Sequence, residues 1–283
     1  MGELKSKRDM ASSLLRQLNG RLTCPYCQEA LELVDMYKLV CVHAHSFDVS
    51  KQGTLYALTQ SGSSQYDKRL FQARQSIIQQ KQLYAPMHDR LVQELDEGDL
   101  LLDAGTGEGS HLNEIKRRFS TILPVGLDIS KDGIQQAAKS YRDHVWIVGD
   151  LANLPFGNQT IDIIINILSP SNYAEFKRVL TSGGKLIKVV PGANYLQELR
   201  AYTAEASAQP YSNSKTIELF NRHFSDTDVQ TLSYKKEVTS EERQWIVDMS
   251  PLGWTVQERA RCDYINKGSS SITIDLTILI ART

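Results

Sequence analysis

The sequence predicts an α/β protein, with a parallel β-sheet buried between helices and a small metal-binding ribbon at the N-terminal end. From residue 99 onward, short apolar runs alternate with segments of helical spacing, which is typical of βαβ units. The first apolar run ends in a glycine-rich turn, LLDAGTGEGS at 101–110. Ahead of it, three of the four cysteines and two of the six histidines lie between residues 24 and 48, and in a reducing compartment such a cluster indicates metal binding.

Composition sets the broad class of protein. The 283 residues, 41% hydrophobic and 23% charged, suffice for one ordinary domain and a small second one. No apolar run reaches the roughly 18 residues of a membrane span, and the first 20 residues lack the apolar core of a signal peptide. We therefore expect a cytoplasmic protein with no membrane partner.

The charge distribution bears on nucleic-acid binding. A net charge of −1 argues against a strong nucleic-acid binder. Residues 1–93, however, carry 12 basic and 8 acidic side chains, whereas residues 94–283 carry 20 and 25. A mildly basic N-terminal part followed by an acidic remainder is compatible with RNA contact through the N-terminal part.

The sequence divides into three predicted parts. Residues 1–60 form the N-terminal Cys3His domain. The small polar stretch SGSSQY at 61–66 begins a linker, and helical spacing broken at Pro86 follows, so that residues 61–98 are linker and helices. Residues 99–283 form the α/β domain. We expect strands at 99–105, 121–129, 144–150, 160–168 and 185–192, helices at 111–119, 133–141 and 173–180, and a last antiparallel strand in SITIDLTILIA.

The glycine-rich turn predicts a nucleotide-like ligand that is not a dinucleotide. Gly105 and Gly107 let the backbone approach a ligand closely, at the carboxyl end of a strand where such ligands bind. An NAD site usually has the spacing G-x-G-x-x-G, and its pyrophosphate lies on the helix N-terminus. Here the spacing is G-x-G-x-G, with Asp103 before it and Glu108 inside it. These two carboxylates would repel a pyrophosphate and attract the cationic S-adenosylmethionine.

Two further acids end the next two predicted strands. Asp128, in GLDIS, is placed to accept hydrogen bonds from both hydroxyls of a ribose. Asp150, in VGDLANLPF, is placed to meet the amino edge of an adenine, and Leu151 beside it offers an apolar wall for the ring. Three acids at the ends of three successive strands indicate one cofactor site.

The cysteine-rich stretch has the spacing C-x2-C-x13-C-x3-H. Cys24, Cys27 and Cys41 with His45, or with His43 in its place, supply four ligands for tetrahedral zinc. A closed set of four ligands predicts a structural Zn2+ site that stabilises a ribbon too small to build its own core. Cys262 stands far away, and we expect it to be a buried apolar residue.

The whole pattern resembles the class I S-adenosylmethionine-dependent methyltransferases, and within them the bacterial 23S rRNA guanine-N1 methyltransferases of the RlmA type, some of which are tied to macrolide and ketolide response. The resemblance runs from Cys24 to the C-terminal region. It rests on CPYC, CVHAHSFD, QLYAP, LDAGTGEG, GLDIS, LPF, GGKLIKV, VVPGANYLQEL and MSPLGW.

The resemblance implies a Rossmann-like, seven-stranded sheet and methylation of guanine N1 in a hairpin loop of domain II of 23S rRNA. It implies that the zinc ribbon helps to grip the RNA. It also implies that the cofactor contacts Tyr84, Gly107, Glu108 and Tyr195, although some members have histidine at the last position. The sequence leaves the target guanine and the oligomeric state open; a homodimer, in which two ribbons flank one RNA, is one arrangement it allows.

No general base stands out, so the catalytic residues are left unnamed. The fourth predicted strand ends in SPS at 169–171, unlike the signature of many amino-methylating relatives, which favours a ring nitrogen as the acceptor. Basic residues ahead of the α/β domain are expected to touch RNA phosphates, namely Lys68, Arg69 and Arg74. Two alternatives stay open. One is a small-molecule methyltransferase with a purely structural zinc, and the other is a zinc-dependent RNA-binding or antibiotic-response module whose nucleotide fold is vestigial.

Overall fold

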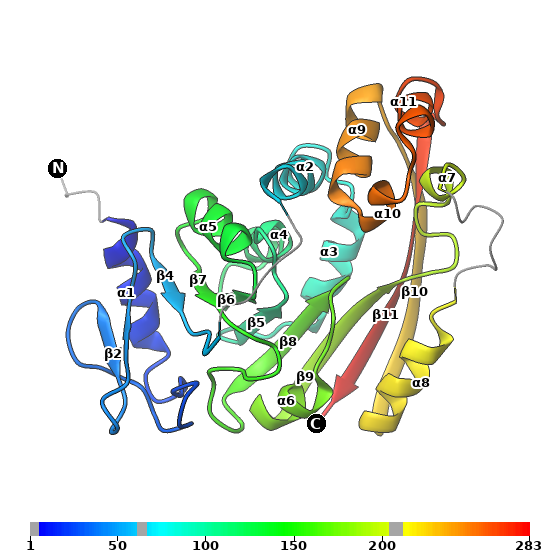
Figure 1. The fold of residues 1–283 in the computed structure, drawn as a ribbon. Helices are drawn as coiled ribbons and strands as arrows, with labels where there is room; N and C mark the ends of the chain where they lie inside the picture. The colour runs from blue at the N-terminus through cyan, green and yellow to red at the C-terminus, as the bar shows by residue number, and fades with distance from the viewer. Residues whose placement is uncertain (1–5, 61–66, 204–211) are drawn as a thin grey trace.

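The computed structural model describes residues 6–60, 67–203 and 212–283, so the linker predicted at 61–66 lies outside the described residues. A central sheet organises the molecule (Figure 1). Its strands, in spatial order, are β10 (Asp226–Glu237), β11 (Ser271–Arg282), β9 (Leu180–Pro191), β8 (Ile161–Ile167), β5 (Leu100–Ala104), β6 (Leu123–Asp128), β7 (Val145–Val148) and β4 (Thr54–Tyr56).

The strand directions confirm the α/β prediction. From β9 through β4 every neighbouring pair is parallel, and β11 runs antiparallel to both β9 and β10. The predicted last strand is therefore confirmed as antiparallel, with β10 lying outside it at the sheet edge. The predicted strands and helices agree with the structure within a few residues, except that β9 begins at Leu180. Because β5, β6 and β7 are parallel neighbours, their carboxyl ends lie at one edge of the sheet.

The strand count differs from the predicted seven. Within the described ranges the sheet has eight strands, because β4 pairs in parallel with β7. The division of the chain at residues 60 and 98 remains a prediction, but β4 belongs to the segment predicted as the N-terminal domain. The metal-binding segment is thus hydrogen-bonded directly to the sheet.

Helices cover both faces of the sheet. One face carries α2 (Lys68–Gln79), α3 (Ala85–Leu91), the short 3-10 helix η1 (Val92–Glu94), α4 (Ser110–Arg118) and α5 (Lys131–Ser140). The opposite face carries α1 (Lys7–Gln17), α6 (Tyr173–Val179) and α8 (Ser214–His223). The longer helices on both faces bury apolar side chains against the sheet, such as Leu112 and Ile115 of α4 and Phe176 of α6. None of the described helices combines the length and the apolar character that a bilayer crossing needs.

The break predicted at Pro86 separates α2 from α3. Tyr84 is the residue before α3, and Pro86 lies in the first turn of that helix, where its missing N–H costs no hydrogen bond. The helical break therefore leaves Tyr84 at the end of a loop that faces the sheet edge.

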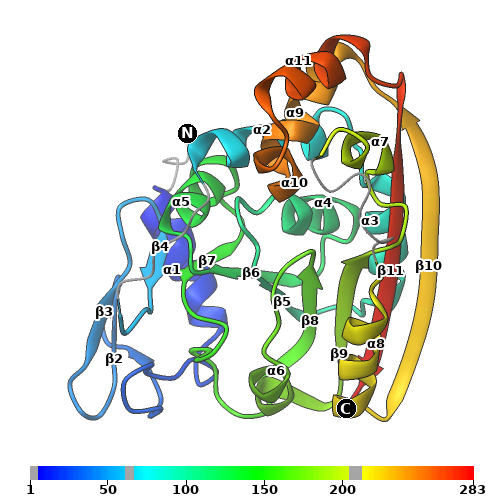
Figure 2. The same ribbon diagram turned by 45° about the vertical axis from the view of Figure 1, so that its right-hand side comes forward.

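A helical insertion lies between β10 and β11. It comprises α9 (Ser240–Met249), α10 (Pro251–Trp254) and α11 (Glu258–Lys267), and α9 packs against α2. Figure 2 shows these helices beside α7 (Gln197–Arg200), at one end of the long β10–β11 hairpin. They lie on the side of the sheet where β5 ends, so they help to enclose that end.

The N-terminal segment forms a small three-stranded antiparallel sheet of β1 (Glu32–Leu33), β2 (Lys38–Val40) and β3 (Ser46–Asp48). Helix α1 lies between this sheet and the large one, where Leu15 and Leu18 are buried. One continuous hydrophobic core joins the ribbon to the second face of the large sheet.

Candidate functional site

The glycine-rich turn after β5 adopts a backbone that favours glycine. Gly105, Gly107 and Gly109 have φ angles of 87°, 61° and 78°. A Cβ on Gly109 would lie 2.4 Å from the ring of Trp146, and one on Gly107 would lie 2.9 Å from Arg74 Nη1. Left-handed backbone and close approach together explain why glycine recurs here.

Asp103 is the penultimate residue of β5 and lies fully buried beneath this turn. The Thr106 hydroxyl donates a 2.6 Å hydrogen bond to Asp103 Oδ2. Burial raises the pKa of Asp103 to about 7; the charges of Asp128 and Glu108 add to the rise, and the Thr106 hydrogen bond opposes it. A cation in the adjacent cavity would favour the ionised form of this carboxyl.

Asp128 ends β6 and is tied to the turn. The Gly107 N–H donates to its Oδ2 at 2.8 Å, and the Ser130 N–H donates to its Oδ1 at 2.7 Å. Burial raises the pKa of Asp128, and these backbone donors oppose the rise. The carboxylate is held in one orientation at the sheet edge, and its remaining lone pairs can accept hydrogen bonds from a ligand.

Asp150 follows β7, the next strand along the same edge. Its carboxylate accepts a 2.8 Å hydrogen bond from the Ala152 N–H, which closes a tight turn, and Leu151 between them is partly buried. The structure thus places the three predicted acids at the ends of three adjacent strands. Asp128, Asp150 and Leu151 lie outside the lining of the cavity described next, along the same sheet edge.

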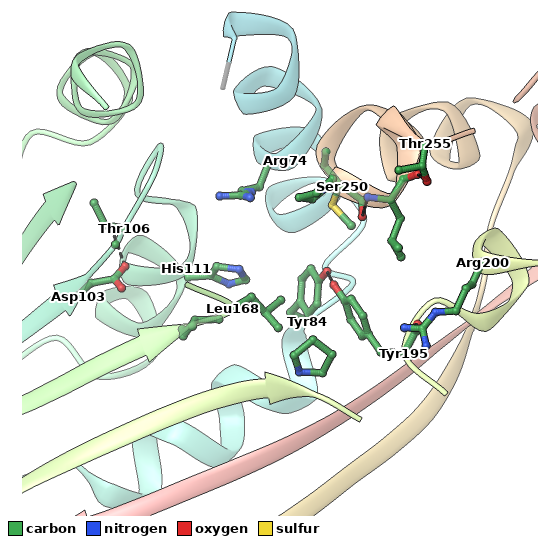
Figure 3. Close-up of a pocket in the computed structure, with 16 residues that line it drawn as sticks. Arg74, Tyr84, Asp103, Thr106, His111, Leu168, Tyr195, Arg200, Ser250 and Thr255 are labelled. Carbon is green, nitrogen blue, oxygen red and sulfur yellow. Dashed lines mark hydrogen bonds between the residues drawn. The ribbon is translucent and has the colours of Figure 1, made fainter. Parts of the chain in front are cut away.

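A cavity of about 460 Å³ opens beside Asp103 and Gly105 (Figure 3). Of the predicted cofactor residues, it is lined by these two and by Tyr84 and Tyr195, whose hydroxyls face each other at 2.6 Å. Burial raises the pKa of both tyrosines, so the pair stays neutral. The remaining lining residues are Arg74, Thr106, His111, Ile167, Leu168, Pro191, Arg200, Met249, Ser250, Pro251, Leu252 and Thr255.

Arg74 points into the cavity rather than toward solvent (Figure 3). Its Nη1 lies 3.8 Å from Oε2 of the fully buried Glu108, whose carboxylate oxygens have no well-aligned hydrogen bond among the described residues. Burial raises the pKa of Glu108, and Arg74 opposes the rise, as do the N–H groups of Glu108 and Ser110 and the Ser110 hydroxyl. Arg74 was expected to touch RNA phosphates; α2 turns this side chain toward the glycine turn and the cavity, and a contact with RNA stays a prediction. Arg69 is exposed, but it pairs with Asp248 at 3.1 Å.

The sequence reasoning also missed a histidine pair. His88 Nε2 and His111 Nδ1 lie 2.9 Å apart, and burial lowers the pKa of both rings, that of His88 to about 3. His88 Nδ1 is buried without a partner, and a bare acceptor is cheaper to leave there than an N–H. His88 therefore donates from Nε2, and His111 Nε2 carries an N–H on the side left to the cavity. His111 is a neutral donor rather than a base.

The far wall of the cavity comes from the helical insertion. Met249, Ser250, Pro251, Leu252 and Thr255 line it, all from the end of α9 and from α10. Their sequence, MSPLGW, contributes to the family resemblance, but no spacing or charge pattern indicated that it would close a site built some 150 residues earlier in the chain.

The end of β8 carries a polar network next to the glycine turn, where a Cβ on Gly105 would lie 1.9 Å from Ser169 Oγ. Lys188, nearly buried on β9, donates to Asn166 Oδ1 at 2.7 Å, to the Ser169 carbonyl at 3.0 Å and to Ser171 Oγ at 2.6 Å. Burial lowers the pKa of Lys188 to about 8. Asp162 lies at the other end of the strand, where it accepts from the Leu100 N–H. Asn166 and Asp162 thus have structural partners.

The four predicted metal ligands meet in the ribbon. Cys24, Cys27, Cys41 and His45 place one ligand atom each within 4.8 Å of the others, and His43 is exposed and outside the group. His45 Nδ1 lies 3.4 Å from both Cys24 Sγ and Cys41 Sγ, and Cys27 Sγ lies 3.6 Å from Cys41 Sγ. Zn–S bonds of about 2.3 Å and Zn–N bonds of about 2.0 Å put tetrahedral neighbours roughly 3.5–3.8 Å apart. The donor set therefore fits zinc.

Cys262 departs from the prediction. It is exposed on α11 rather than buried. The α11 helix is short and mostly polar, and Cys262 lies on its outer side.

Comparisons with known proteins agree with this geometry. Residues 101–184 match the family described as "Methyltransferase domain". The chain is 34% identical to YxjB of Bacillus subtilis, provisionally named a 23S rRNA (guanine-N(1)-)-methyltransferase, over 91% of this chain and 95% of that one. It is 26% identical to the 23S rRNA (guanine(748)-N(1))-methyltransferase of Streptomyces fradiae, over 92% and 96%.

Among solved structures, a provisionally named methyltransferase from an antibiotic biosynthesis pathway of Anabaena variabilis superposes with a TM-score of 0.51. It is 14% identical and covers 70% of this chain and 96% of its own. The fold is that of the class I S-adenosylmethionine-dependent methyltransferases, with one strand added at the β7 edge.

Proposed function

This chain belongs to the 23S rRNA (guanine-N1)-methyltransferase family, and from that premise we propose that it transfers a methyl group from S-adenosylmethionine to N1 of a guanine in 23S rRNA. The observation that carries the proposal is the set of buried acids beside the cavity. Asp103 lines a cavity large enough for a methionine group and a base, and the buried Glu108 lies 3.8 Å behind Arg74, another lining residue. Negative charge there suits a cationic cofactor and opposes a pyrophosphate.

We assign the adenosine half of the cofactor to the carboxyl ends of β6 and β7. Asp128 would accept from the ribose hydroxyls, and Asp150 with Leu151 would receive the adenine. The support is their placement on adjacent parallel strands, with each carboxylate already oriented by a backbone N–H donor. Gly107 brings the backbone close enough for the ribose to reach Asp128.

We assign the methionine half to the cavity. Asp103 would face its ammonium group, and Arg74 would bind its carboxylate. The Arg74 side chain donates no hydrogen bond to any described residue, and its nearest anion is 3.8 Å away, so its donors are available to a ligand. Tyr84 and Tyr195 would pack against the aliphatic chain and exclude water.

When bound, S-adenosylmethionine supplies an already activated methyl group, so the protein's task is alignment in a dry pocket. Leu168 and the α10 residues would hold the flipped guanine against that group. Guanine N1 must lose a proton, and the developing charge at O6 would be stabilised by a neutral donor such as His111 Nε2–H. None of the described residues that line the cavity is placed as an obvious general base, since Asp103 is committed to the cofactor.

The ribbon would contribute RNA contact. Zinc would be held by Cys24, Cys27, Cys41 and His45. It would fix the two turns that carry these ligands, which we call the first knuckle (residues 24–28) and the second knuckle (residues 41–45). On those knuckles Tyr26 and Val42 are 56% and 80% exposed, so both side chains are accessible to a partner. We propose that they meet a hairpin loop of domain II, whose partly unstacked bases suit aromatic contact. A homodimer with two ribbons on one RNA belongs to the same proposal.

Primer extension tests the function. Unmodified 23S rRNA is incubated with protein and S-adenosylmethionine and then copied with reverse transcriptase. Methyl on N1 blocks Watson–Crick pairing, so a new stop in the domain II hairpin is expected, and it identifies the guanine. An Asp128→Ala variant, which should not hold the ribose, is the negative control. No stop on intact RNA, with cofactor binding shown by calorimetry, would favour a small-molecule substrate, whereas no heat of binding would favour a vestigial site.

A further inference from the structure

The first cysteine knuckle is hydrogen-bonded to the loop that follows β7. This loop, residues 150–157, begins with the acid assigned to adenine. On the N-terminal side, the Thr23 N–H donates to the Pro155 carbonyl at 3.1 Å, and the Gly157 N–H donates to the Arg21 carbonyl at 2.8 Å. The metal site and the loop proposed to contact the adenine are therefore neighbours in space, although more than 120 residues separate them in sequence.

One side chain joins the two. Asn153 Nδ2 donates to the Pro25 carbonyl at 2.9 Å, and Asn153 Oδ1 accepts from Gln28 Nε2 at 2.8 Å. Pro25 and Gln28 belong to the knuckle that carries Cys24 and Cys27. The side-chain amide of Asn153 thus makes hydrogen bonds to two residues of the first knuckle at the same time.

On its other side, Asn153 closes the turn at Asp150. Its backbone N–H donates to the Asp150 carbonyl at 3.1 Å, and the two residues form an isolated β-bridge. A displacement of Asn153 would therefore shift Asp150. Its neighbour Leu154 is held separately, by an N–H donated to Glu175 Oε2 at 2.9 Å, so the backbone after the turn is fixed and the Asn153 side chain is the part that depends on the knuckle.

The knuckle conformation itself needs an external constraint. Gln28 has a φ of 62°, which is unfavourable for a residue with a Cβ. Its N–H donates to the Cys24 carbonyl at 2.8 Å, which closes the turn. Metal bound to Cys24 and Cys27 would hold this turn closed and keep the Pro25 carbonyl and the Gln28 amide where Asn153 meets them.

We propose that Asn153 is a positioning residue that couples the metal site to the cofactor site, so that a metal-loaded ribbon strengthens S-adenosylmethionine binding through Asp150. The proposal rests on the proposed function, because it takes Asp150 as the adenine contact. Coupling between two binding sites is reciprocal in affinity, so bound cofactor raises the affinity for zinc by the same factor, and we expect this gain to appear as slower release of zinc. The ribbon then acts on the cofactor as well as on RNA.

The backbone pairing around residues 22 and 156 does not depend on the Asn153 side chain, so the effect of removing that side chain can be measured by itself. That pairing involves Leu22 and Phe156, both buried, and it persists when the amide of Asn153 is removed. An Asn153→Ala variant should therefore keep the fold, the ribbon and its zinc. It should lose only the link between the knuckle and the turn.

The test measures the affinity for S-adenosylhomocysteine by calorimetry in zinc-loaded wild type, Asn153→Ala and Gln28→Gly. Gln28→Gly relieves the unfavourable φ and removes one of the two hydrogen bonds, so it should keep zinc firmly while still weakening the ligand. Asn158→Ala is the matched control, because Asn158 lies in the same region but its side chain bonds only Arg178 among the described residues. A second readout is the rate of zinc release to a chromogenic chelator, with and without ligand.

Loss of both hydrogen bonds should weaken binding about three- to tenfold in Asn153→Ala, and less in Gln28→Gly, with Asn158→Ala unchanged. Ligand should slow zinc release from the wild type but not from Asn153→Ala. Unchanged affinity in Asn153→Ala, or ligand protection of zinc that survives in that variant, would overturn the coupling while leaving the proposed function intact. A wild type that binds no ligand would instead overturn both.

Discussion

Replacing Arg74 with methionine should remove the proposed contact with the cofactor's carboxylate while keeping the packing of the side chain's aliphatic part. Arg74 is 26% exposed and lies 3.8 Å from a fully buried Glu108. At such a separation a charge pair in a partly screened pocket contributes up to about 4 kcal/mol, and a hydrogen bond to a charged group about 1.5–3 kcal/mol. Arg74 already interacts with Glu108 before the cofactor binds, so the net loss should be about 2–3 kcal/mol. That corresponds to roughly 30- to 150-fold weaker binding.

Two ligands separate this effect from a general collapse of the pocket. Calorimetry should show the full loss for S-adenosylhomocysteine, which has a carboxylate. It should show a change of about twofold or less for 5′-methylthioadenosine, which shares the adenosine and the thioether but lacks the amino-acid group. Arg69→Met is the control, because Arg69 lies on the same helix but is 67% exposed. Equal losses for both ligands, or no loss for S-adenosylhomocysteine, would refute the assignment.

Three other substitutions test the cavity, the polar network at the end of β8 and the glycine turn. With the pKa of Asp103 raised to about 7 from an ordinary 3.8, a cationic cofactor must favour its ionised form. Below the pKa of about 8 of the cofactor's α-amino group, S-adenosylmethionine affinity should therefore rise as pH increases from about 5.5 to about 7 in the wild type and stay flat in Asp103→Asn. The same pKa shift means that the buried Asp103 carboxyl lowers the folding stability as pH rises from about 4 to 7, by up to about 4 kcal/mol. Asp103→Asn should therefore melt at a higher temperature than the wild type at pH 8 but not at pH 4. The reverse order of melting temperatures would contradict the burial argument. Lys188→Met removes three hydrogen bonds that hold residues 166–171 and should slow methyl transfer about 10- to 100-fold, with cofactor affinity within about twofold; a change in affinity alone would exclude this role. Gly109→Ala adds a Cβ 2.4 Å from Trp146 at a φ of 78° and should destabilise the fold by about 2–4 kcal/mol in denaturant unfolding, whereas Gly98→Ala, with a φ of 85° but no atom within 4 Å, should cost only about 1 kcal/mol.

Much of the site could be predicted because it depends on local sequence. Gly105 and Gly107 are required by a backbone that the turn itself imposes, and Asp128 and Asp150 end strands whose apolar runs are visible in the sequence. Parallel neighbouring strands must end at one edge, so the acids were bound to lie together. The Cys and His spacing similarly limited the metal site to two alternatives, and the structure brings His45 rather than His43 to the cysteines.

The sequence shows Arg74 as a basic side chain on a helix, but it does not show that the helix turns this side chain toward the cavity. Its direction depends on the packing of α2 against α9, and α9 lies some 170 residues later in the chain. The far wall of the cavity from Met249 to Thr255 was missed for the same reason. His111 was missed because the role of its free nitrogen is decided by His88, its partner from another helix.

By itself, the sequence determined the α/β class, the glycine turn, the acids of the sheet edge and the ligands of the ribbon. Each of these follows from residues close together in the chain or from the periodicity of single elements. Only the tertiary structure decided that β4 joins the large sheet, that Arg74 faces Glu108 and that Asn153 meets the cysteine knuckle. Those contacts join segments roughly 30 to 130 residues apart. They are set by how apolar faces pack, and packing uses side-chain shape in three dimensions, which no linear spacing records.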